Sequence, residues 1–468
     1  MLGKIRRIHF VGIGGIGMSG IAEVLLNLGF QVSGSDLKVT PVTDRLASLG
    51  ARVFEGHAAA NASHAQVVVV SSAVPVGNPE IQEAQRRQIP VIPRAEMLAE
   101  LMRLKFNVAV AGAHGKTTVT SMIAVMLAEA KLDPTAVIGG RLDVFGSSAR
   151  LGKGELMVVE ADESDRSFLY LLPSIAVVTN IDREHLDHYR DLDEIASAFV
   201  SFMNKVPFYG AVVVCFDPPW RELIQTRMPE LRRRVVTYGL DPGSNVQGNL
   251  HELMPSGSTF DATVKGQNLG RFSLGIPGRH NVQNALAAVA VGWELELTVE
   301  QIRHGLECFR GADRRFQIRA EVGSITIVDD YGHHPTEIRA TLDAARLQGA
   351  KRVIAIFQPH RYTRTKFLLD ELAGCFAGCE RVYVLDIYAA SEPPIPGVTS
   401  ERLVARINEM GSSDARYAPS DEQVIHDILE EARPGDLILT IGAGSVWKIG
   451  EALAKALRKS RQELQVRS

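Results

Sequence analysis

Several kinds of residue and segment are scarce in this 468-residue chain, and each scarcity excludes a class of protein. Only four cysteines occur and none forms a Cys-x-x-Cys pair, which predicts a reducing compartment, the cytoplasm. No uninterrupted apolar run is long enough to span a bilayer and no apolar signal core follows the first residues, so we expect neither a membrane partner nor a secretory leader. The formal net charge is only −3, so we do not expect a nucleic-acid partner.

The length of the chain predicts several domains, because 468 residues exceed what one hydrophobic core usually holds. Short apolar strands alternate with helices, which predicts an α/β fold in three domains. We expect a Rossmann-like sheet in 1–104, a mononucleotide-binding sheet in 105–310 and a second Rossmann-like sheet in 311–468. Short alternating runs rich in Gly, Pro, Ser and Asn at 235–278 predict a β-rich insertion in the central domain.

The strongest motif is the stretch FNVAVAGAHGKTTVTS at 106–121. Its apolar run predicts a buried parallel strand, a glycine turn follows, and Gly-Lys-Thr begins a helix. In such an arrangement backbone N–H groups hold phosphates, the lysine reaches the outer phosphates and the threonine hydroxyl binds Mg²⁺. Val110 stands where the usual pattern has its first glycine, and a turn that binds nothing is the alternative. The predicted phosphate-loop residues are Gly112, Ala113, His114, Gly115, Lys116, Thr117 and Thr118.

A second glycine loop follows an expected strand at 8–11. Gly12, Gly14 and Gly17 fit the G-x-G-x-x-G pattern, which binds a pyrophosphate at a helix N-terminus. Asp36 ends the next expected strand, where it can bind a ribose hydroxyl. NAD and a UDP-sugar both present these groups, so the motif does not choose between them, and a turn without a ligand is the third alternative.

Two other features of the N-terminal domain suit a ligand. Ser71 and Ser72 follow an apolar strand at 67–70, and open α/β sheets bind ligands at the carboxyl ends of their strands. Arg94 could meet an anionic ligand or lie in solvent. The predicted ligand-binding residues of this domain are Gly12, Gly14, Gly15, Gly17, Asp36, Ser71, Ser72 and Arg94.

Two strands of the central domain end in side chains that could bind a metal ion. Glu160 follows the apolar run 156–159, and His185 lies in the loop after the run 175–178. If these strands flank the phosphate-loop strand, Thr117 and Glu160 supply the oxygen ligands that a hard cation prefers. His185 fits a metal ligand and a surface histidine equally well. Several acidic residues nearby are expected to be solvated loop charges, within the set Asp162, Glu163, Asp165, Asp182, Glu184 and Asp187.

Polar residues also gather at a later helix start and at the C-terminal strand ends. His280 and Asn284 could cap the helix expected at 285–295 or hydrogen-bond a base, and capping is slightly favoured. Four strands of the C-terminal domain each end in a polar or glycine cluster, and a parallel sheet brings such ends to one side. The concentration of His, Arg, Tyr and Asp side chains at these strand ends predicts a binding site. The site is expected to include Tyr331, His333, His360 and Arg361.

Together these motifs resemble those of the Mur ligase family over nearly the whole chain. The matching stretches are GIGGIGMSGIAE (12–23), GAHGKTT (112–118), EADESD (160–165), TNID (179–182), GRHNVQNALAA (278–288), DDYGHHPTE (329–337), FQPHRYTRT (357–365) and DIYAASEPPIPG (386–397). The resemblance implies an ATP-dependent, ADP-forming, amide-forming ligase of cytoplasmic peptidoglycan synthesis. YGHHPTE and FQPHRYTRT point to the member that joins L-alanine to UDP-N-acetylmuramate through an acyl phosphate.

The resemblance also implies where ligands bind: UDP in the loop 12–17, ATP in the central domain, and alanine against the C-terminal loops. It implies that His185 joins Thr117 and Glu160 around Mg²⁺. Ala113 departs from the Thr or Asn usual in the family, and 187–202 contain no lysine, so we expect no carbamylated lysine there. The residues expected to contact the nucleotide beside the phosphate loop are His280, Asn284, Arg315 and Asp330.

The expected chemistry begins with phosphorylation of the muramoyl carboxylate, aided by Lys116 and Mg²⁺. His333 or His360 would then take a proton from the alanine ammonium, and Arg361 would bind the alanine carboxylate. We expect a monomer or a weak homodimer. The full set of expected catalytic residues is Lys116, Glu160, His185, His333, His360 and Arg361.

Three alternatives stay open at this point. The first glycine loop alone fits a nicotinamide-dependent oxidoreductase, and the phosphate loop alone fits a nucleotide-dependent switch protein. A ligase of the same family could also join a different amino acid or a whole peptide. One methyl group changes binding by only about 1–3 kcal/mol, so the sequence separates alanine from glycine or serine only by resemblance.

Overall fold

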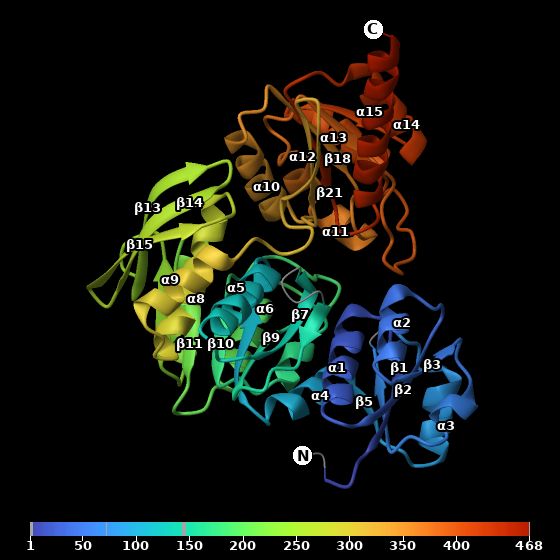
Figure 1. The fold of residues 1–468 in the computed structure, drawn as a ribbon, viewed down its shortest axis with the longest axis vertical. Helices are drawn as coiled ribbons and strands as arrows, with labels where there is room; N and C mark the ends of the chain where they lie inside the picture. The colour runs from blue at the N-terminus through green and yellow to red at the C-terminus, as the bar shows by residue number, and fades with distance from the viewer. Residues whose placement is uncertain (1–2, 72, 143–146, 468) are drawn as a thin grey trace.

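The protein is described here by a computed structural model covering residues 3–71, 73–142 and 147–467 (Figure 1). Three α/β domains follow one another along the chain, each built around its own sheet, of five, ten and six strands. The expected three-domain α/β architecture is therefore confirmed. Ser72, one of the predicted ligand-binding residues, lies outside the described residues.

The N-terminal sheet is entirely parallel, with strand order β3-β2-β1-β4-β5. The valine run of β4 is largely buried, as expected for β-branched residues in a covered parallel strand. Its strands are β1 (Arg7–Val11), β2 (Gln31–Asp36), β3 (Arg52–Glu55), β4 (Val67–Val70) and β5 (Val91–Pro93), and its α-helices are α1 (Ile16–Asn27), α2 (Pro41–Ser48), α3 (Pro79–Arg86) and α4 (Arg94–Met102).

The central sheet has the order β15-β14-β13-β12-β11-β10-β6-β9-β7-β8. Strand β6, which leads into the phosphate loop, lies between β10 and β9, so all three carboxyl ends meet at one edge. The antiparallel β13, β14 and β15 extend the sheet at one end, which confirms the β-rich insertion (Figure 1). The strands are β6 (Phe106–Ala111), β7 (Thr135–Leu142), β8 (Ser147–Arg150), β9 (Leu156–Glu160), β10 (Ile175–Val178), β11 (Ala211–Cys215), β12 (Val235–Gly239), β13 (Val246–Met254), β14 (Gly257–Val264) and β15 (Gln267–Leu274), and the α-helices are α5 (Lys116–Glu129), α6 (Leu192–Met203), α7 (Arg221–Arg227), α8 (Arg279–Glu294) and α9 (Val299–Cys308).

The C-terminal sheet has the order β16-β17-β21-β18-β19-β20, parallel except for β16. The carboxyl ends of β17, β18, β19 and β21 therefore lie on one side of the sheet, as the sequence predicts. The strands are β16 (Gln317–Val322), β17 (Ile325–Asp330), β18 (Arg352–Phe357), β19 (Arg381–Val384), β20 (Asp414–Tyr417) and β21 (Asp436–Ile441), and the α-helices are α10 (Pro335–Leu347), α11 (Tyr362–Phe367), α12 (Leu369–Ala373), α13 (Ser400–Met410), α14 (Asp421–Glu431) and α15 (Trp447–Arg467).

The two seams between the domains differ in chemistry. Helix α1 packs against β7 and β8, and one apolar cluster runs from the N-terminal domain into the central domain. The C-terminal domain has separate apolar clusters, and its side-chain contacts with the central domain include several charged pairs. Because one apolar core spans the first seam, we do not expect the N-terminal and central domains to move relative to each other near Leu104. A relative motion of the C-terminal domain is expected at the connector near Arg310.

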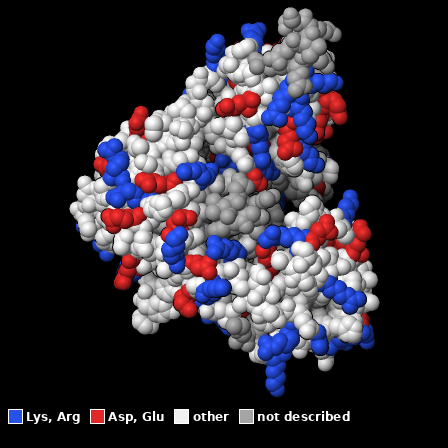
Figure 2. Space-filling view, viewed as in Figure 1, with Lys and Arg blue, Asp and Glu red and all other residues white. Residues whose placement is uncertain are grey.

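The surface carries both signs of charge without segregation on the face shown in Figure 2. This mixture agrees with the small net charge of the chain. Among the described residues, no helix is both long enough and apolar enough to cross a membrane.

Candidate functional site

The phosphate loop joins β6 to α5. Gly115 precedes the helix with φ of +80°, and a Cβ there would lie 2.7 Å from Asn284 Oδ1, so both conformation and space favour glycine. No side chain caps this helix, so its first N–H groups are available to an anion. The loop therefore has the geometry of a phosphate-binding turn despite Val110.

Lys116 is folded back over this loop. Its Nζ donates hydrogen bonds to Gly112 O at 2.7 Å and Glu163 Oε1 at 2.8 Å. Burial opposes the charge, but the carboxylates of Glu163 and Glu160 outweigh it and raise the pKa of Lys116. A permanent positive charge thus lies at the mouth of the phosphate loop.

Thr117 and Glu160 have the geometry of a magnesium-ligand pair. Thr117 Oγ1 lies 3.1 Å from Glu160 Oε1, and two neighbouring ligands of an octahedral Mg²⁺ at about 2.1 Å would lie roughly 3 Å apart. Gly139 N–H donates to the second oxygen of Glu160 at 2.8 Å and orients the carboxylate. Burial raises the pKa of Glu160, and a bound cation would favour the charged form.

His185 lies beside a second acidic group. Its Nε2 is 3.5 Å from Glu163 Oε1 and 3.6 Å from Glu184 Oε2, and one ligand atom from each residue falls within a 4.8 Å cluster. Glu163 Oε2 and His185 Nδ1 are buried without a hydrogen-bond partner. Unsatisfied buried groups of this kind fit residues that receive a ligand or cation.

Among the six acidic residues expected to include several solvated loop charges, at least three are buried or hydrogen-bonded. Glu163 and Glu184 are 2% and 6% exposed, and Asp182 accepts hydrogen bonds from His114 and Thr336. The physical reason is that the loops after β9 and β10 face buried basic and polar groups, including those of the C-terminal domain. We therefore include these three acidic residues among the candidate site residues.

Charged contacts hold the C-terminal domain against the central one. Arg364 donates to Glu184 Oε1 through Nε at 3.0 Å and Nη2 at 2.6 Å. Arg361 Nη1 donates to Asp187 Oδ2 at 2.8 Å. The predicted alanine-binding arginine is thus part of an ion pair across the seam.

The two candidate bases differ in their hydrogen bonds. His360 Nδ1 accepts from Arg364 at 3.0 Å, whereas His333 Nδ1 lies 3.1 Å from the carbonyl of Tyr331 and must donate to it. Burial, followed by Arg364, lowers the pKa of His333 to about 4; burial, followed by His333, lowers that of His360 to about 2. Both imidazoles are neutral at pH 7, and Nε2 of His333 keeps its lone pair for a proton.

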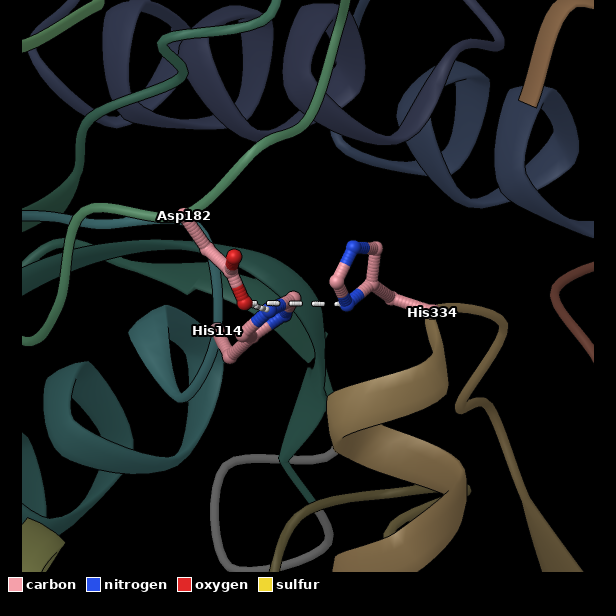
Figure 3. Close-up of side chains that lie close together, drawn as sticks. All are labelled: His114, Asp182 and His334. Carbon is pink, nitrogen blue, oxygen red and sulfur yellow. Dashed lines mark hydrogen bonds and ion pairs between the residues drawn. The ribbon is translucent and has the colours of Figure 1, made fainter. Parts of the chain in front are cut away.

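A three-residue cluster joins the phosphate loop to the start of α10 (Figure 3). His114 Nε2 lies 3.0 Å from Asp182 Oδ2, and His334 Nδ1 lies 3.8 Å from the same oxygen. Burial opposes a charge on His114, but the hydrogen bond to Asp182 and the carboxylate of Glu337, 3.6 Å from Nδ1, outweigh it and raise the pKa of His114 to about 10. The pKa of His334 is lowered by burial and by His114, so the positive charge resides on His114.

This shift predicts a pH-dependent stability. A histidine whose pKa is raised from 6.5 to about 10 stabilises the fold fully below pH 6.5, and the contribution is lost as the pH rises towards 10. His114→Gln should therefore show a flatter dependence of Tm on pH between 6.5 and 10 than the wild type. Thermal unfolding of both proteins in one buffer series measures the difference, and parallel curves would contradict the assignment.

The predicted nucleotide residues meet in a cavity of about 110 Å³. His280, Asn284, Arg315 and Asp330 all contribute to its lining. Helix α8 has Gly278 as N-cap and no side-chain cap, so the capping alternative is wrong. Burial, followed by Arg315, lowers the pKa of His280 to about 4, which leaves a neutral ring.

Asp330 braces the connector into the C-terminal domain. It accepts backbone hydrogen bonds from Phe316 and Gly332, both at 2.7 Å. Burial raises its pKa to about 6. Arg315 approaches Glu337 at 3.3 Å and lies over the ring of Tyr331. These contacts bring the connector to the nucleotide cavity.

A larger cavity of about 660 Å³ is lined by residues of all three domains. The sequence-predicted lining residues are Ala113, Gly115, Lys116, Thr117, Glu160, His185, Arg315, Tyr331, His333, His360 and Arg361. Its N-terminal wall comes from α1 and α2, through Ser19, Glu23 and Arg45. The described glycine-loop residues are not in this lining, so the structure separates them from the reacting groups.

The glycine loop has its own local order. Gly14 N–H donates to Asp36 Oδ2 at 2.8 Å, so this carboxylate supports the turn. A Cβ at Gly12 would lie 3.7 Å from Ser71 Cβ, which brings the end of β4 beside the loop. Arg94 lies against Gly17 and 3.5 Å from Asp162, between the first glycine loop and the loop after β9.

Sequence reasoning missed two residues that the structure makes prominent. Arg364 lies one helical turn after His360, within a stretch already noted, and this i,i+4 spacing is the available signal. Glu337 completes a capping box with His334 at the start of α10 and points to His114, 3.6 Å away. The His-Pro-Thr-Glu sequence carries that signal.

Comparison with known proteins places this geometry in a family. Three family models match in order: "Mur ligase family, catalytic domain" over residues 7–106, "Mur ligase middle domain" over 110–292 and "Mur ligase, glutamate ligase domain" over 314–444. A UDP-N-acetylmuramate–L-alanine ligase from Solibacter usitatus is 57% identical, covering 98% of this chain and 97% of that protein. One from Acidobacterium capsulatum is 56% identical, covering 98% and 99%.

A solved structure agrees with these relatives. The UDP-N-acetylmuramate-alanine ligase of Thermotoga maritima superimposes with a TM-score of 0.81 at 28% identity, covering 97% of this chain and 99% of that one. A murein peptide ligase from Psychrobacter arcticus gives 0.72 at 26% identity, covering 97% and 98%. The chain therefore belongs to the Mur ligase family.

Proposed function

We propose that this chain joins L-alanine to UDP-N-acetylmuramate in an ATP-dependent, amide-forming step of peptidoglycan synthesis. The observation that carries this is the 660 Å³ cavity, where the phosphate-loop lysine meets histidine and arginine side chains of the C-terminal domain. Relatives more than 50% identical over nearly the whole chain are named for this reaction. The nicotinamide and switch alternatives would leave the convergence of the three domains without a purpose.

ATP would bind with its phosphates on the loop 112–118 and its base in the 110 Å³ cavity beside His280 and Asn284. Mg²⁺ would be held by Thr117 and Glu160, with His185 and Glu163 as a second candidate position. When bound, it would neutralise charge on the phosphoryl oxygens. The open backbone N–H groups of α5 and the 3.1 Å separation of Thr117 and Glu160 support this assignment.

The first step transfers the γ-phosphoryl group to the muramoyl carboxylate, which becomes an acyl phosphate as ADP leaves. Lys116, which lines the larger cavity, would release Glu163 and turn to the transferring group. In the second step the alanine amine attacks the acyl carbon and phosphate departs. Shielding from water requires the closed arrangement that Arg364 and Glu184 support.

The alanine ammonium must lose a proton before it attacks. We propose His333 as the acceptor, since its Nε2 lone pair is available whereas Nδ1 of His360 is engaged by Arg364. His333→Ala should lower the rate of alanine-dependent turnover about 10²- to 10⁴-fold while leaving acyl-phosphate formation detectable, and His360→Ala should affect it less. Rapid-quench assays of each variant measure both steps, and an unchanged alanine rate in His333→Ala contradicts the role.

UDP would lie at the glycine loop 12–17, with Asp36, Ser71 and Arg94 around it. Arg361 would bind the alanine carboxylate with the part of its guanidinium that Asp187 leaves unengaged. We further propose the domain limits 1–104, 105–310 and 311–468, a monomer or weak homodimer, and a cytoplasmic reaction. Tyr331 would form part of the substrate wall, since it lines the larger cavity.

Phosphate release from ATP and Mg²⁺ with UDP-N-acetylmuramate, measured with and without a panel of amino acids, tests the function. Release that requires both the sugar nucleotide and L-alanine supports it. Dependence on another amine would keep the mechanism and change the substrate to that of a sister ligase. No release with any amine contradicts the proposal.

A further inference from the structure

A group of metal-ligating side chains lies outside both cavities. Glu129 ends α5, and His304 and Cys308 lie on α9. One ligand atom from each falls within 4.8 Å of the other two. Lys116 begins the same helix α5, so the group lies about 20 Å from the phosphate loop and is separate from the reacting groups.

Packing of two helices, rather than a loop, brings these residues together. A Cβ on Gly305 would lie only 2.5 Å from Met126 Cα, so the backbones of α9 and α5 are in close contact at this point. His304 and Cys308 are four residues apart and share one face of α9. Glu129 lies three residues beyond Met126 and so faces the same junction.

The distances suit a tetrahedral ion. His304 Nε2 lies 3.4 Å from Glu129 Oε2 and 3.6 Å from Cys308 Sγ. Metal–ligand bonds of 2.0–2.3 Å at tetrahedral angles separate ligand atoms by about 3.3–3.7 Å. Sγ is also 4.0 Å from Nδ1, so the imidazole must rotate to aim Nε2 at a shared ion. Its side chain is 60% exposed, so this rotation displaces no core residue.

We propose that Glu129, His304 and Cys308 form a binding site for Zn²⁺ or a similar divalent transition metal, with water as the fourth ligand. A thiolate and an imidazole favour such an ion over Mg²⁺, which prefers oxygen ligands. Binding exchanges the thiol proton of Cys308 for the metal and releases it to solvent, without oxidation or reduction.

The proposed metal site lies directly before the connector into the C-terminal domain. Cys308 is the last residue of α9, and the connector into the C-terminal domain follows at once. Phe309 is fully buried, so the chain is anchored directly beside the site. A bound metal therefore links the end of the phosphate-loop helix to the beginning of the connector.

A second group of metal-ligating residues, His114, Asp182 and His334, is less suited to a metal. Asp182 Oδ2 already accepts hydrogen bonds from His114 at 3.0 Å and Thr336 at 2.9 Å. His334 Nδ1 likewise accepts from the Thr336 N–H at 3.3 Å. The three atoms that face one another are therefore engaged, and the cluster belongs to the seam already described.

Cobalt provides a direct test, because thiolate ligation produces a near-ultraviolet charge-transfer band that oxygen and nitrogen ligands at the phosphate loop cannot produce. We expect the full-length protein, without nucleotide or Mg²⁺, to develop this band up to one equivalent of Co²⁺ and to lose it on adding Zn²⁺. Cys308→Ser should abolish the band. His304→Ala should weaken Co²⁺ binding more than about tenfold, since losing even an outer partner costs 10- to 100-fold.

The chain offers matched controls. His426 and Glu430 form an exposed i,i+4 pair on α14 without a cysteine, and His426→Ala should leave the titration unchanged. Cys215, Cys375 and Cys379 are buried, so these thiols should not contribute. No band in the wild type, or the same band in Cys308→Ser, overturns the proposal. His304→Ala tests the site independently if Cys308→Ser folds poorly.

Discussion

Lys116→Met is expected to lower kcat/KM for phosphate release at least about a thousandfold, which corresponds to about 4 kcal/mol of transition-state stabilisation. The reason is that negative charge spreads over the phosphoryl oxygens during transfer, and Lys116 is a cation buried at the mouth of the phosphate loop. The measurement is coupled phosphate release at saturating UDP-N-acetylmuramate and L-alanine.

The structure also supplies a control for this substitution. Removing Lys116 deprives the buried carboxylate of Glu163 of its lysine partner and leaves only His185 beside it, so part of any loss could come from misfolding of the loop. Lys116→Met combined with Glu163→Gln removes that uncompensated charge. If the double variant recovers activity to near the wild-type level, the lysine does not stabilise the transition state, and our assignment fails.

Arg364→Ala is expected to lower turnover about 10²- to 10³-fold without lowering the Tm of the N-terminal and central domains. The substitution leaves Glu184, which is 6% exposed, without its ion-pair partner, and such a loss costs about 3–5 kcal/mol. Glu184 and Arg364 belong to different domains. Separation of the two domains would therefore expose Glu184 to water and remove the cost of its buried, unpaired charge. Small-angle scattering should then give a larger radius of gyration for the variant.

A double-mutant cycle separates this pair from other effects. The double variant Glu184→Gln/Arg364→Ala should lose less activity than the sum of the losses in the two single variants. The reason is that both substitutions remove the same interaction. Arg406→Ala is the matched control, since Arg406 pairs with exposed carboxylates on the same domain. Strict additivity of Glu184→Gln and Arg364→Ala would show that the pair does not hold the closed arrangement.

Much of the architecture is readable from local sequence, for a physical reason. The apolar run of β6, the glycine turn and the helix start are neighbours in the chain, so their arrangement depends on short-range conformational preference. The same holds for the four C-terminal strands that end in polar clusters. The wall that α1 and α2 contribute to the larger cavity was not predicted, because it depends on how two domains pack.

The errors in the site have the same origin. Glu163 and Glu184 follow strands in loops, and loop carboxylates are usually solvated. Here one is buried by Lys116 and the other by Arg364, which is 180 residues away along the chain. The capping expectation for Asn284 was wrong because α8 begins at Arg279, so Asn284 lies inside the helix, where its side chain contacts Gly115. Burial by distant segments leaves no periodic signal in the sequence.

The contrast between the two domain seams gives them opposite responses to ionic strength. The Arg361–Asp187 pair at the C-terminal seam is partly exposed, so added chloride should weaken it, whereas the buried Arg364–Glu184 pair should be screened much less. The apolar seam between α1 and the β7–β8 hairpin should be insensitive to chloride and strengthened by sulfate. In concentrated electrolyte the N-terminal and central domains should therefore stay joined through their shared apolar core, while the exposed part of the contact with the third domain weakens.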